Sequence, residues 1–253
     1  MLKKRVIPTL LLSDNRLKKG INFKNYRDVG DPISSVKIYN NQFADELIFI
    51  NIDRDSSHEY LCDLLKKVSE NCFIPLCAGG SIDSTSKIRD LLNSGADKVM
   101  ITTAALNDFN LIEKSVNMFG GQAIVIGIDI ITEDKQFYLS TFSKKLVHKD
   151  IDIFAYIKKF EDIGVGEILI NFVDLDGLMK GPNIEFSKKI AEFTNLPVIY
   201  LGGIGNVFHI LDLFEKTKIN AVACASIFHY GDNNTIRIRS TLKNKGIKQR
   251  KVK

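Results

Sequence analysis

Three carboxylates stand where apolar segments end, and such groups can transfer protons. Asp129 closes the run VIGID, and Asp174 and Asp176 lie in the segment VDLDG, directly after another apolar run. A carboxylate at the end of a buried strand loses solvation unless it faces a site opening, and the resulting environment suits general acid or base work. Capping of the next loop or helix is the alternative interpretation, and it applies most to Asp174.

Glycine pairs beside hydroxyl side chains could bind phosphate. Gly79 and Gly80 precede Ser81 in IPLCAGGSID, and Thr102 and Thr103 end the next apolar run. Backbone N–H groups at a helix start, together with hydroxyls, are the donors that a phosphate dianion needs. We therefore expect a first phosphate cradle that includes Gly80, Ser81 and Thr103.

The same pattern recurs about half a chain later. In LPVIYLGGIGN, Gly202 and Gly203 end an apolar run, and Ser226 follows the next one. Two cradles half a barrel apart would suit a long substrate with a phosphate at each end. Glycines that only permit tight turns are the alternative, which the duplication makes weaker.

Four charged residues mark the opposite ends of the apolar runs. Arg5, Glu46, Lys98 and Glu167 each open or immediately precede such a run. In a barrel they would meet at the bottom as two positive and two negative charges, an arrangement that tolerates burial because the charges are paired. Ordinary charges at strand starts, facing solvent, are the alternative.

Strands and helices alternate in a way that could position all of these groups. Helix-length amphipathic segments, such as 60–70, 85–94, 154–163 and 184–193, lie between most of eight strand-like runs: 6–12, 47–52, 74–78, 98–102, 123–129, 167–172, 197–201 and 221–225. This order predicts an α/β fold, a single-domain (β/α)8 TIM barrel over residues 1–253, with an open doubly wound sheet as the second choice.

The chain also repeats itself. ADELIFINID resembles VGEILINFVD, and nearly equal spacings separate Glu46 from Glu167 and Gly79 from Gly202. Two half-barrel repeats explain these spacings, whereas an open sheet gives no reason for them.

Composition excludes several classes of protein. The four cysteines lack paired spacing and the four histidines share no metal-ligand pattern, so we expect buried free thiols, no metal and no cofactor. The net charge of +5 is modest, and its densest part is a basic C-terminal tail at about 243–253 that we expect to be solvated. We expect no nucleic-acid partner, and the absence of a long apolar run or a signal-peptide pattern predicts a cytoplasmic protein without a membrane partner.

The motifs together carry a resemblance over essentially the whole chain. The N-terminal segment MLKKRVIPTLLLSDNRLKKGINFKNYRDVGDP, with AGGSI, GADKVMITTAA, GEILINFVDLDG, LGGIGN and ASIFH, resembles the cyclase subunit of imidazole glycerol phosphate synthase, the HisF family. The resemblance implies a barrel that docks a HisH-like glutaminase on its bottom face. Ammonia then passes a ring of four charges and reacts at the top with a bis-phosphorylated aminoimidazole ribonucleotide, which is cleaved and cyclised.

Site roles follow from the resemblance, residue by residue. Arg5, Glu46, Lys98 and Glu167 match the ammonia gate, and Asp129 matches one of two essential acid/base aspartates. Lys19 matches a mobile active-site loop, and it joins the phosphate- and substrate-binding candidates Gly80, Ser81, Thr103, Asp176, Gly177, Gly202, Gly203 and Ser226.

Departures from the family pattern concentrate at the barrel mouth. Leu11 stands where the second essential aspartate is expected, and a leucine cannot transfer a proton. Asn51, Thr102, Asn171 and Ser81 also differ from the family residues. The gate residues match the family, whereas several residues at the barrel mouth differ from it. This contrast favours a divergent paralogue that supplies ammonia to a separate sugar amidotransferase in surface-polysaccharide synthesis. A true cyclase of histidine biosynthesis and a catalytically silent scaffold that activates the glutaminase are the alternatives.

Overall fold

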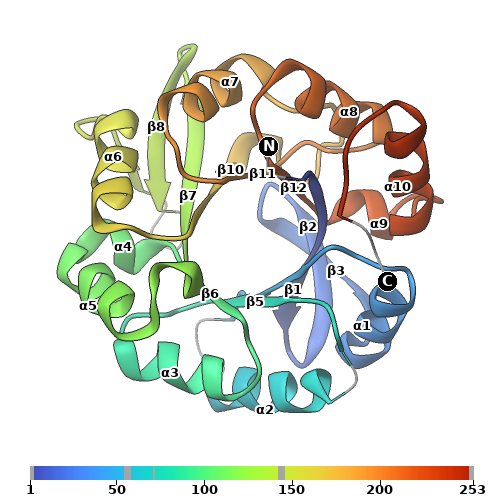
Figure 1. Ribbon diagram of the computed structural model, residues 1–253, viewed down its shortest axis with the longest axis horizontal. Helices are drawn as coiled ribbons and strands as arrows, with labels where there is room; N and C mark the ends of the chain where they lie inside the picture. The colour runs from blue at the N-terminus through green and yellow to red at the C-terminus, as the bar shows by residue number, and fades with distance from the viewer. Residues whose placement is uncertain (1–2, 54–57, 71, 142–145, 251–253) are drawn as a thin grey trace.

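The computed structural model, which describes residues 3–53, 58–70, 72–141 and 146–250, is a closed barrel of parallel strands surrounded by helices (Figure 1). The barrel strands follow one another in chain order, and the last strand, β12, pairs with the first, β1, to close the barrel. All eight expected strands are present, and the open-sheet alternative is excluded. They are β1 (Arg5–Ser13), β4 (Leu47–Asn51), β5 (Leu76–Gly79), β6 (Lys98–Ile101), β7 (Ile124–Glu133), β10 (Glu167–Phe172), β11 (Val198–Leu201) and β12 (Ala221–Cys224).

Most of the outer helices begin at a side chain that caps their first turn. Asp31, Ser84, Asp108, Asp152, Asn183, Asn206 and Asn234 each accept a hydrogen bond from the backbone N–H three residues ahead. Such caps satisfy donors that have no partner within the helix. The helices are α1 (Pro32–Asn41), α2 (His58–Ser69), α3 (Thr85–Asn93), α5 (Phe109–Phe119), α6 (Ile153–Ile163), α7 (Ile184–Phe193), α8 (Val207–Lys216) and α10 (Thr235–Asn244), and shorter ones are α4 (Thr103–Asn107) and α9 (Ser226–His229).

Antiparallel strands extend the carboxyl ends of two barrel strands, and the sequence analysis missed them. β2 (Arg16–Ile21) and β3 (Lys24–Gly30) form a hairpin on β1, while β8 (Gln136–Thr141) and β9 (Leu146–His148) extend β7. Their polar composition gives little apolar alternation. The sequence signal for these hairpins is the polar turn pairs Asp14–Asn15 and Asp134–Lys135. In the structure both pairs have the positive φ angles of tight hairpin turns.

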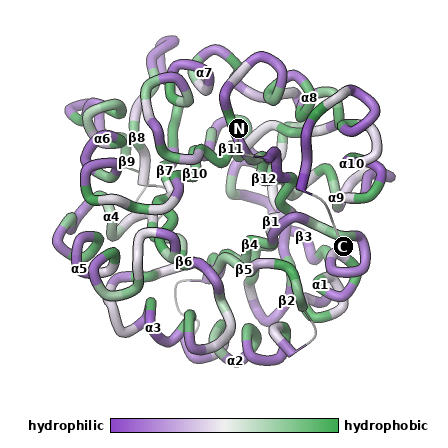
Figure 2. Tube along the Cα trace, viewed as in Figure 1, coloured by the Kyte–Doolittle hydropathy of each residue, from purple (hydrophilic) through white to green (hydrophobic). Residues whose placement is uncertain are grey.

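Two separate apolar clusters follow from the alternation of side chains along the strands. The larger one lies between strands and helices, and the smaller one fills the barrel interior. Figure 2 shows hydrophobic residues concentrated on the strands that line the barrel. The interior cluster consists of Ile7, Ile48, Cys77, Met100, Val125, Leu169, Ile199, Ala221 and Ala223.

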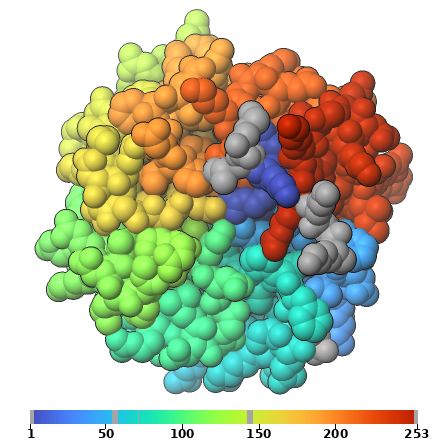
Figure 3. Space-filling view, viewed as in Figure 1, coloured from blue at the N-terminus to red at the C-terminus, as the bar shows by residue number. Residues whose placement is uncertain are grey.

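Part of the basic tail is bound rather than solvated. The backbone N–H of Lys4 donates to the carbonyl of Lys248 over 3.1 Å, and Gln249 donates from its side chain to the carbonyl of Arg239. Ile247 packs against the core. The described segments at Lys4 and at Lys248–Gln249 therefore lie side by side, and residues 251–253 of the expected tail are outside the described residues (Figures 1 and 3).

Candidate active site

The four charged residues at the amino-terminal ends of the strands form one closed ring of ion pairs. The guanidinium of Arg5 lies 2.7 Å from Glu46 Oε2 and 2.7 Å from Glu167 Oε1. On the other side, Lys98 Nζ lies 3.0 Å from Glu46 and 3.2 Å from Glu167. Each carboxylate thus bridges both cations, as the sequence analysis expected for a ring of two positive and two negative charges.

Contact between opposite charges offsets the cost of burying this ring. Burial is the largest influence on the pKa of Lys98 and lowers it, but Glu46 and Glu167 outweigh that effect and the net shift is upward. Burial raises the pKa of the Glu46 carboxyl, against the opposing effects of Lys98 and Arg5. Lys98 and Arg5 both contact the Glu46 carboxylate and favour its ionised form, because a charge left alone on either side would be buried without compensation.

Inside the ring, the barrel interior is apolar. The next inward-facing side chains along β1, β4 and β10 are Ile7, Ile48 and Leu169, which are fully or almost fully buried. Such a layer does not solvate ions. Neutral small molecules can therefore occupy this path far more readily than charged ones.

At the opposite end of the barrel, Asp129 faces the mouth and is held by a neighbouring amide. Asn171 Nδ2 donates to Asp129 Oδ1 over 2.8 Å, and the two residues are partners in the register of β7 and β10. Burial raises the pKa of Asp129 to about 6, with a smaller upward contribution from Asp176 and an opposing one from Asn171. A carboxyl with this pKa can take up or release a proton near neutral pH.

Leu11 is the matching position on β1. Its inward face follows from alternation with Ile7, which lies in the interior cluster. The structure thus places an aliphatic side chain on the mouth side of β1, where the resemblance implies a second acid/base group, and an acid/base carboxyl only at the matching level of β7, at Asp129.

The two glycine turns have the same construction in both halves of the barrel. A Cβ on Gly80 would lie 2.2 Å from the carbonyl oxygen of Asn51, and one on Gly202 would lie 2.8 Å from that of Phe172. Both glycines have φ near +117°, a conformation that side chains rarely adopt. This equivalence supports the half-barrel repeat. Asn51 ends β4, the barrel strand that precedes β5 and Gly80, and Phe172 ends β10, the barrel strand that precedes β11 and Gly202.

Each glycine turn lies beside the start of a short helix. Strands β5 and β6 are neighbours, so Gly80 and Ser81 lie beside Thr103, the first residue of α4. Strands β11 and β12 are neighbours too, so the second turn lies beside Ser226, the first residue of α9. The structure therefore brings each expected cradle together, on opposite sides of the mouth.

The second cradle is further defined by a loop that packs against it. The backbone N–H of Gly181 donates to the carbonyl of Gly203 over 2.8 Å, and a Cβ on Gly203 would lie 2.2 Å from the Gly181 carbonyl oxygen. Gly177 at the start of this loop has φ +74° and packs against Gly20 of the β2–β3 hairpin.

Lys19 connects this hairpin to the β10 side of the mouth. Its ammonium lies 2.7 Å from Asp176 Oδ1, and the side chain is almost completely buried. The backbone N–H of Asn22 donates to the Asp176 carbonyl, and the Tyr230 hydroxyl donates to the Lys19 carbonyl. Lys19, Asp176 and Gly177 are thus brought together as the sequence analysis grouped them, with the hairpin folded against the mouth.

His229 is a neighbour of Lys19, and the sequence analysis considered it only as one of four histidines without a metal-ligand pattern. Burial and the Lys19 charge lower its pKa to about 4. It is therefore neutral at physiological pH and does not add a positive charge to the mouth.

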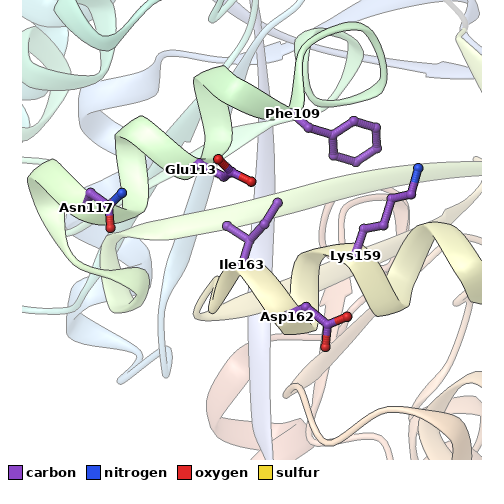
Figure 4. A pocket seen from close by; sticks show the side chains of 6 residues that line it. All are labelled: Phe109, Glu113, Asn117, Lys159, Asp162 and Ile163. Carbon is purple, nitrogen blue, oxygen red and sulfur yellow. The ribbon is translucent and has the colours of Figure 1, made fainter.

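Other groups show no comparable convergence. Cys62, Cys72, Cys77 and Cys224 are buried free thiols. Within the described ranges, no three His, Cys, Asp or Glu side chains are grouped as metal ligands would be. A surface groove of about 570 Å³ lies between α5 and α6, where Lys159 lies over the Phe109 ring (Figure 4), but it is separated from the mouth by the barrel wall.

Comparison with known proteins agrees with this geometry. The profile of the family described as histidine biosynthesis protein matches residues 5–234. The chain belongs to this family. It is 37% identical over 250 residues to the imidazole glycerol phosphate synthase subunit HisF of Staphylococcus carnosus (strain TM300), covering 98% of both chains.

Two further relatives carry the same description. The HisF subunit of Clostridium botulinum (strain Kyoto / Type A2) is 35% identical over 254 residues, covering 99% of this chain and all of the relative. That of Bacillus cereus (strain Q1) is 37% identical over 255 residues, with the same coverage. These names agree with the resemblance to HisF and favour the histidine-biosynthesis alternative over the sugar-amidation interpretation. In the part of the chain that the structure describes, no helix is long and apolar enough to cross a membrane.

Proposed function

We propose that this chain is the HisF-type subunit of an imidazole glycerol phosphate synthase. It receives ammonia at the ion-pair ring and combines it at the mouth with a bis-phosphorylated aminoimidazole ribonucleotide. The observation that carries the proposal is the coexistence of this ring at one end of a closed barrel with Asp129 and two glycine cradles at the other.

The interior supports the passage of neutral ammonia. An apolar layer separates the ring of Arg5, Glu46, Lys98 and Glu167 from the mouth. Ammonium would lose its hydration in that layer without a counter-ion, whereas neutral ammonia gives up only hydrogen bonds. The ring therefore acts as an entrance that must open locally, while the apolar layer selects the neutral form.

The mouth supports a substrate with two phosphates. Two turns of equivalent construction, each beside the first residue of a short helix, present backbone N–H groups on opposite sides. Lys19 supplies a cation at the mouth, where it is held by Asp176. The relatives named as imidazole glycerol phosphate synthase subunits support the same substrate class.

Asp129 transfers the proton in the proposed reaction, and the rate is limited because Leu11 stands where a second acid/base group would act. With a pKa of about 6, Asp129 is mostly ionised at neutral pH and can accept a proton from the attacking nitrogen. Loss of a second acid/base group costs about 10²–10⁴-fold in rate. We therefore expect a slow cyclase whose rate rises when Leu11 is replaced by Asp.

The bottom face supports a glutaminase partner. Phe43, Phe73 and Met118 are exposed large apolar side chains, and Phe73 is 88% exposed. All three lie at or just after the ends of helices that lead into barrel strands, which is the end where the ion-pair ring lies. Exposed apolar groups around a charged entrance are the composition expected of a docking face.

The test of ammonia delivery compares two nitrogen sources. Lys98→Ala opens the ring, so glutamine-dependent product formation in the complex with the glutaminase should fall severalfold more than ammonia-dependent formation. Lys66→Ala removes an exposed lysine paired with Asp63 on α2 and serves as the matched control. Equal effects of Lys98→Ala on both nitrogen sources would contradict the proposed route.

A second candidate function is favoured by one specific observation, the aliphatic side chain of Leu11 at the mouth. The same barrel would then conduct ammonia without performing the cyclase step and would supply a separate sugar amidotransferase in surface-polysaccharide synthesis. The substitutions at Asn51, Ser81, Thr102 and Asn171 point the same way, because they alter the mouth and leave the ring unchanged. Absence of cyclase turnover with glutaminase binding retained would favour this candidate.

A catalytically silent scaffold predicts a different result. A scaffold that only activates the glutaminase needs no phosphate site, so neither inorganic phosphate nor a bis-phosphate should raise its melting temperature. Stabilisation by a bis-phosphate that is lost in Gly203→Ala would contradict the scaffold.

A further inference from the structure

Two polar atoms inside the barrel are buried without a partner among the described residues. They are Thr9 Oγ1 and Asn171 Oδ1, on side chains that are 1% and 6% exposed. Buried polar atoms in folded proteins are nearly always hydrogen-bonded, to protein, water or ligand. Both atoms are therefore open to a small hydrogen-bonding molecule such as water or ammonia.

Both side chains face the barrel interior. On β1, Val6 and Leu10 lie in the outer core and Ile7 in the interior cluster, so Thr9 faces inward by alternation.

The same reasoning applies to β10. Ile168 and Ile170 lie in the outer core and Leu169 in the interior cluster, so Asn171 faces inward. Thr9 and Asn171 are each the third inward-facing residue of their strand, after a ring charge and one apolar side chain. An eight-stranded barrel is just wide enough for its side chains to meet, so groups at this level share one small space.

The amide nitrogen of Asn171 is already hydrogen-bonded to Asp129, so the amide oxygen is the atom that can bind a further molecule. Asn171 Nδ2 donates to Asp129 Oδ1 over 2.8 Å, which leaves Oδ1 as an acceptor turned away from the carboxylate. Along β10, Asn171 follows Leu169 of the apolar layer, so a molecule bound to Oδ1 lies at the mouth end of that layer, on the residue that also contacts Asp129.

The chemistry of the two atoms favours a small neutral molecule, and on the proposed ammonia route that molecule is ammonia in place of water. An amide oxygen only accepts hydrogen bonds, and a threonine hydroxyl both accepts and donates one. An anion would face the Asn171 acceptor, and a cation would have to cross the apolar layer. Ammonia has three N–H donors and one lone pair, so it satisfies both groups as a neutral molecule.

We propose that Thr9 and Asn171 form an ammonia-binding station inside the barrel, in which Asn171 Oδ1 accepts an N–H of ammonia and Thr9 Oγ1 supplies the second hydrogen bond. The inference rests on the proposed ammonia route and adds the residues that hold the nucleophile before it reaches Asp129. Both are positioning residues, because the proton transfer itself belongs to Asp129.

The first test needs no substrate. The side-chain amide resonance of Asn171 in the ¹⁵N-labelled protein is assigned by its absence in Asn171→Thr. The protein is then titrated with ammonium chloride at alkaline pH, where neutral ammonia is present, and at acid pH, where ammonium dominates. Potassium chloride controls for ionic strength. A saturable shift at alkaline pH only, weakened in Thr9→Val, is the expected result.

The second test separates binding from chemistry. Thr9→Val keeps the shape of the side chain and removes the hydroxyl, so the KM for ammonia should rise about threefold to tenfold with a smaller effect on kcat. Ser187→Ala on α7 is the matched control, because Ser187 Oγ is also buried and unpaired among the described residues but lies on an outer helix. Its KM for ammonia should equal that of the wild type.

The outcomes distinguish the station from the proposed reaction. A saturable Asn171 shift without any cyclase turnover would support the station and contradict the reaction. Turnover with no Asn171 shift and an unchanged KM in Thr9→Val would overturn the station and leave the reaction standing. Equal shifts with ammonium chloride at acid pH and with potassium chloride would also overturn it, because they would reflect salt or water alone.

Discussion

The amide of Asn171 donates to the carboxylate of Asp129 across 2.8 Å, between the neighbouring parallel strands β7 and β10. This contact favours the ionised form of a carboxyl that burial pushes the other way. It sets the fraction of Asp129 that can act as a base at neutral pH.

The pH dependence of Asp129 tests this contact. Asn171→Leu removes the hydrogen bond at similar volume, so the pKa of Asp129 should rise above about 6, where the intact site holds it. The ¹³C resonance of the Asp129 carboxyl, followed through a pH titration, measures the shift. If Asp129 acts as a base, the acid limb of the rate profile should move to higher pH as well. An unchanged or lower pKa would show that Asn171 does not stabilise the carboxylate.

The same carboxyl should cost the folded protein stability at neutral pH. Its pKa is raised from 3.8 to about 6 on folding, so between these values the folded state binds more protons than the unfolded state. The free energy of unfolding therefore falls as pH rises through this window, by about 1–2 kcal/mol for a partly accessible group.

Asp129→Asn should remove this dependence. The variant should be more stable than the wild type by that amount at about pH 8 and should match it at about pH 4. Urea unfolding at the two pH values gives the difference. A variant that is less stable than the wild type at alkaline pH would contradict a destabilising burial of Asp129.

The buried Lys19–Asp176 pair should hold the β2–β3 hairpin against the mouth. Asp176→Asn leaves the Lys19 ammonium buried without its counter-ion, at a cost of about 2–4 kcal/mol. Because the hairpin can open by itself, hydrogen exchange should accelerate over residues 16–30 more than in the barrel strands.

A control for this prediction exists within the same hairpin. Asp28→Asn breaks the exposed pair with Arg16, and exposed pairs contribute at most about 1 kcal/mol. Similar exchange rates in Asp176→Asn and Asp28→Asn would show that the hairpin does not depend on the buried pair.

The docking face should depend on its apolar side chains. Phe73 is 88% exposed at the end where the ion-pair ring lies, so Phe73→Asp should weaken glutaminase binding by at least about tenfold, as truncated apolar contacts at an interface often do. Phe208→Asp is the control, because Phe208 is 61% exposed on α8, on the mouth side. Calorimetric titration measures both. Equal affinities for the two variants would place the partner elsewhere.

The sequence was sufficient to predict the barrel because its signals are repeated and local. Eight buried strands read as apolar runs, and the glycine turns at Gly80 and Gly202 appear twice in the same context. The charges that open the strands could be listed from the sequence, and the expected barrel brought them together at its bottom.

The missed features depend on contacts between distant segments. The β2–β3 hairpin is too polar to show strand alternation, and its position depends on Asp176 from a remote loop. The bond between Asn171 and Asp129 needs the register of β7 against β10, which no local pattern contains. The binding of Lys248 beside Lys4 likewise follows from the closure of the barrel, which brings the ends of the chain together.

The most direct test of the proposed function is ammonia-dependent turnover of the bis-phosphorylated aminoimidazole ribonucleotide by the purified chain, beside Leu11→Asp and Asp129→Asn. The account predicts slow turnover by the wild type, a rise of about tenfold or more in Leu11→Asp, and loss in Asp129→Asn. No turnover by the wild type or by Leu11→Asp, with glutaminase binding intact, would contradict the cyclase and direct the ammonia to another acceptor.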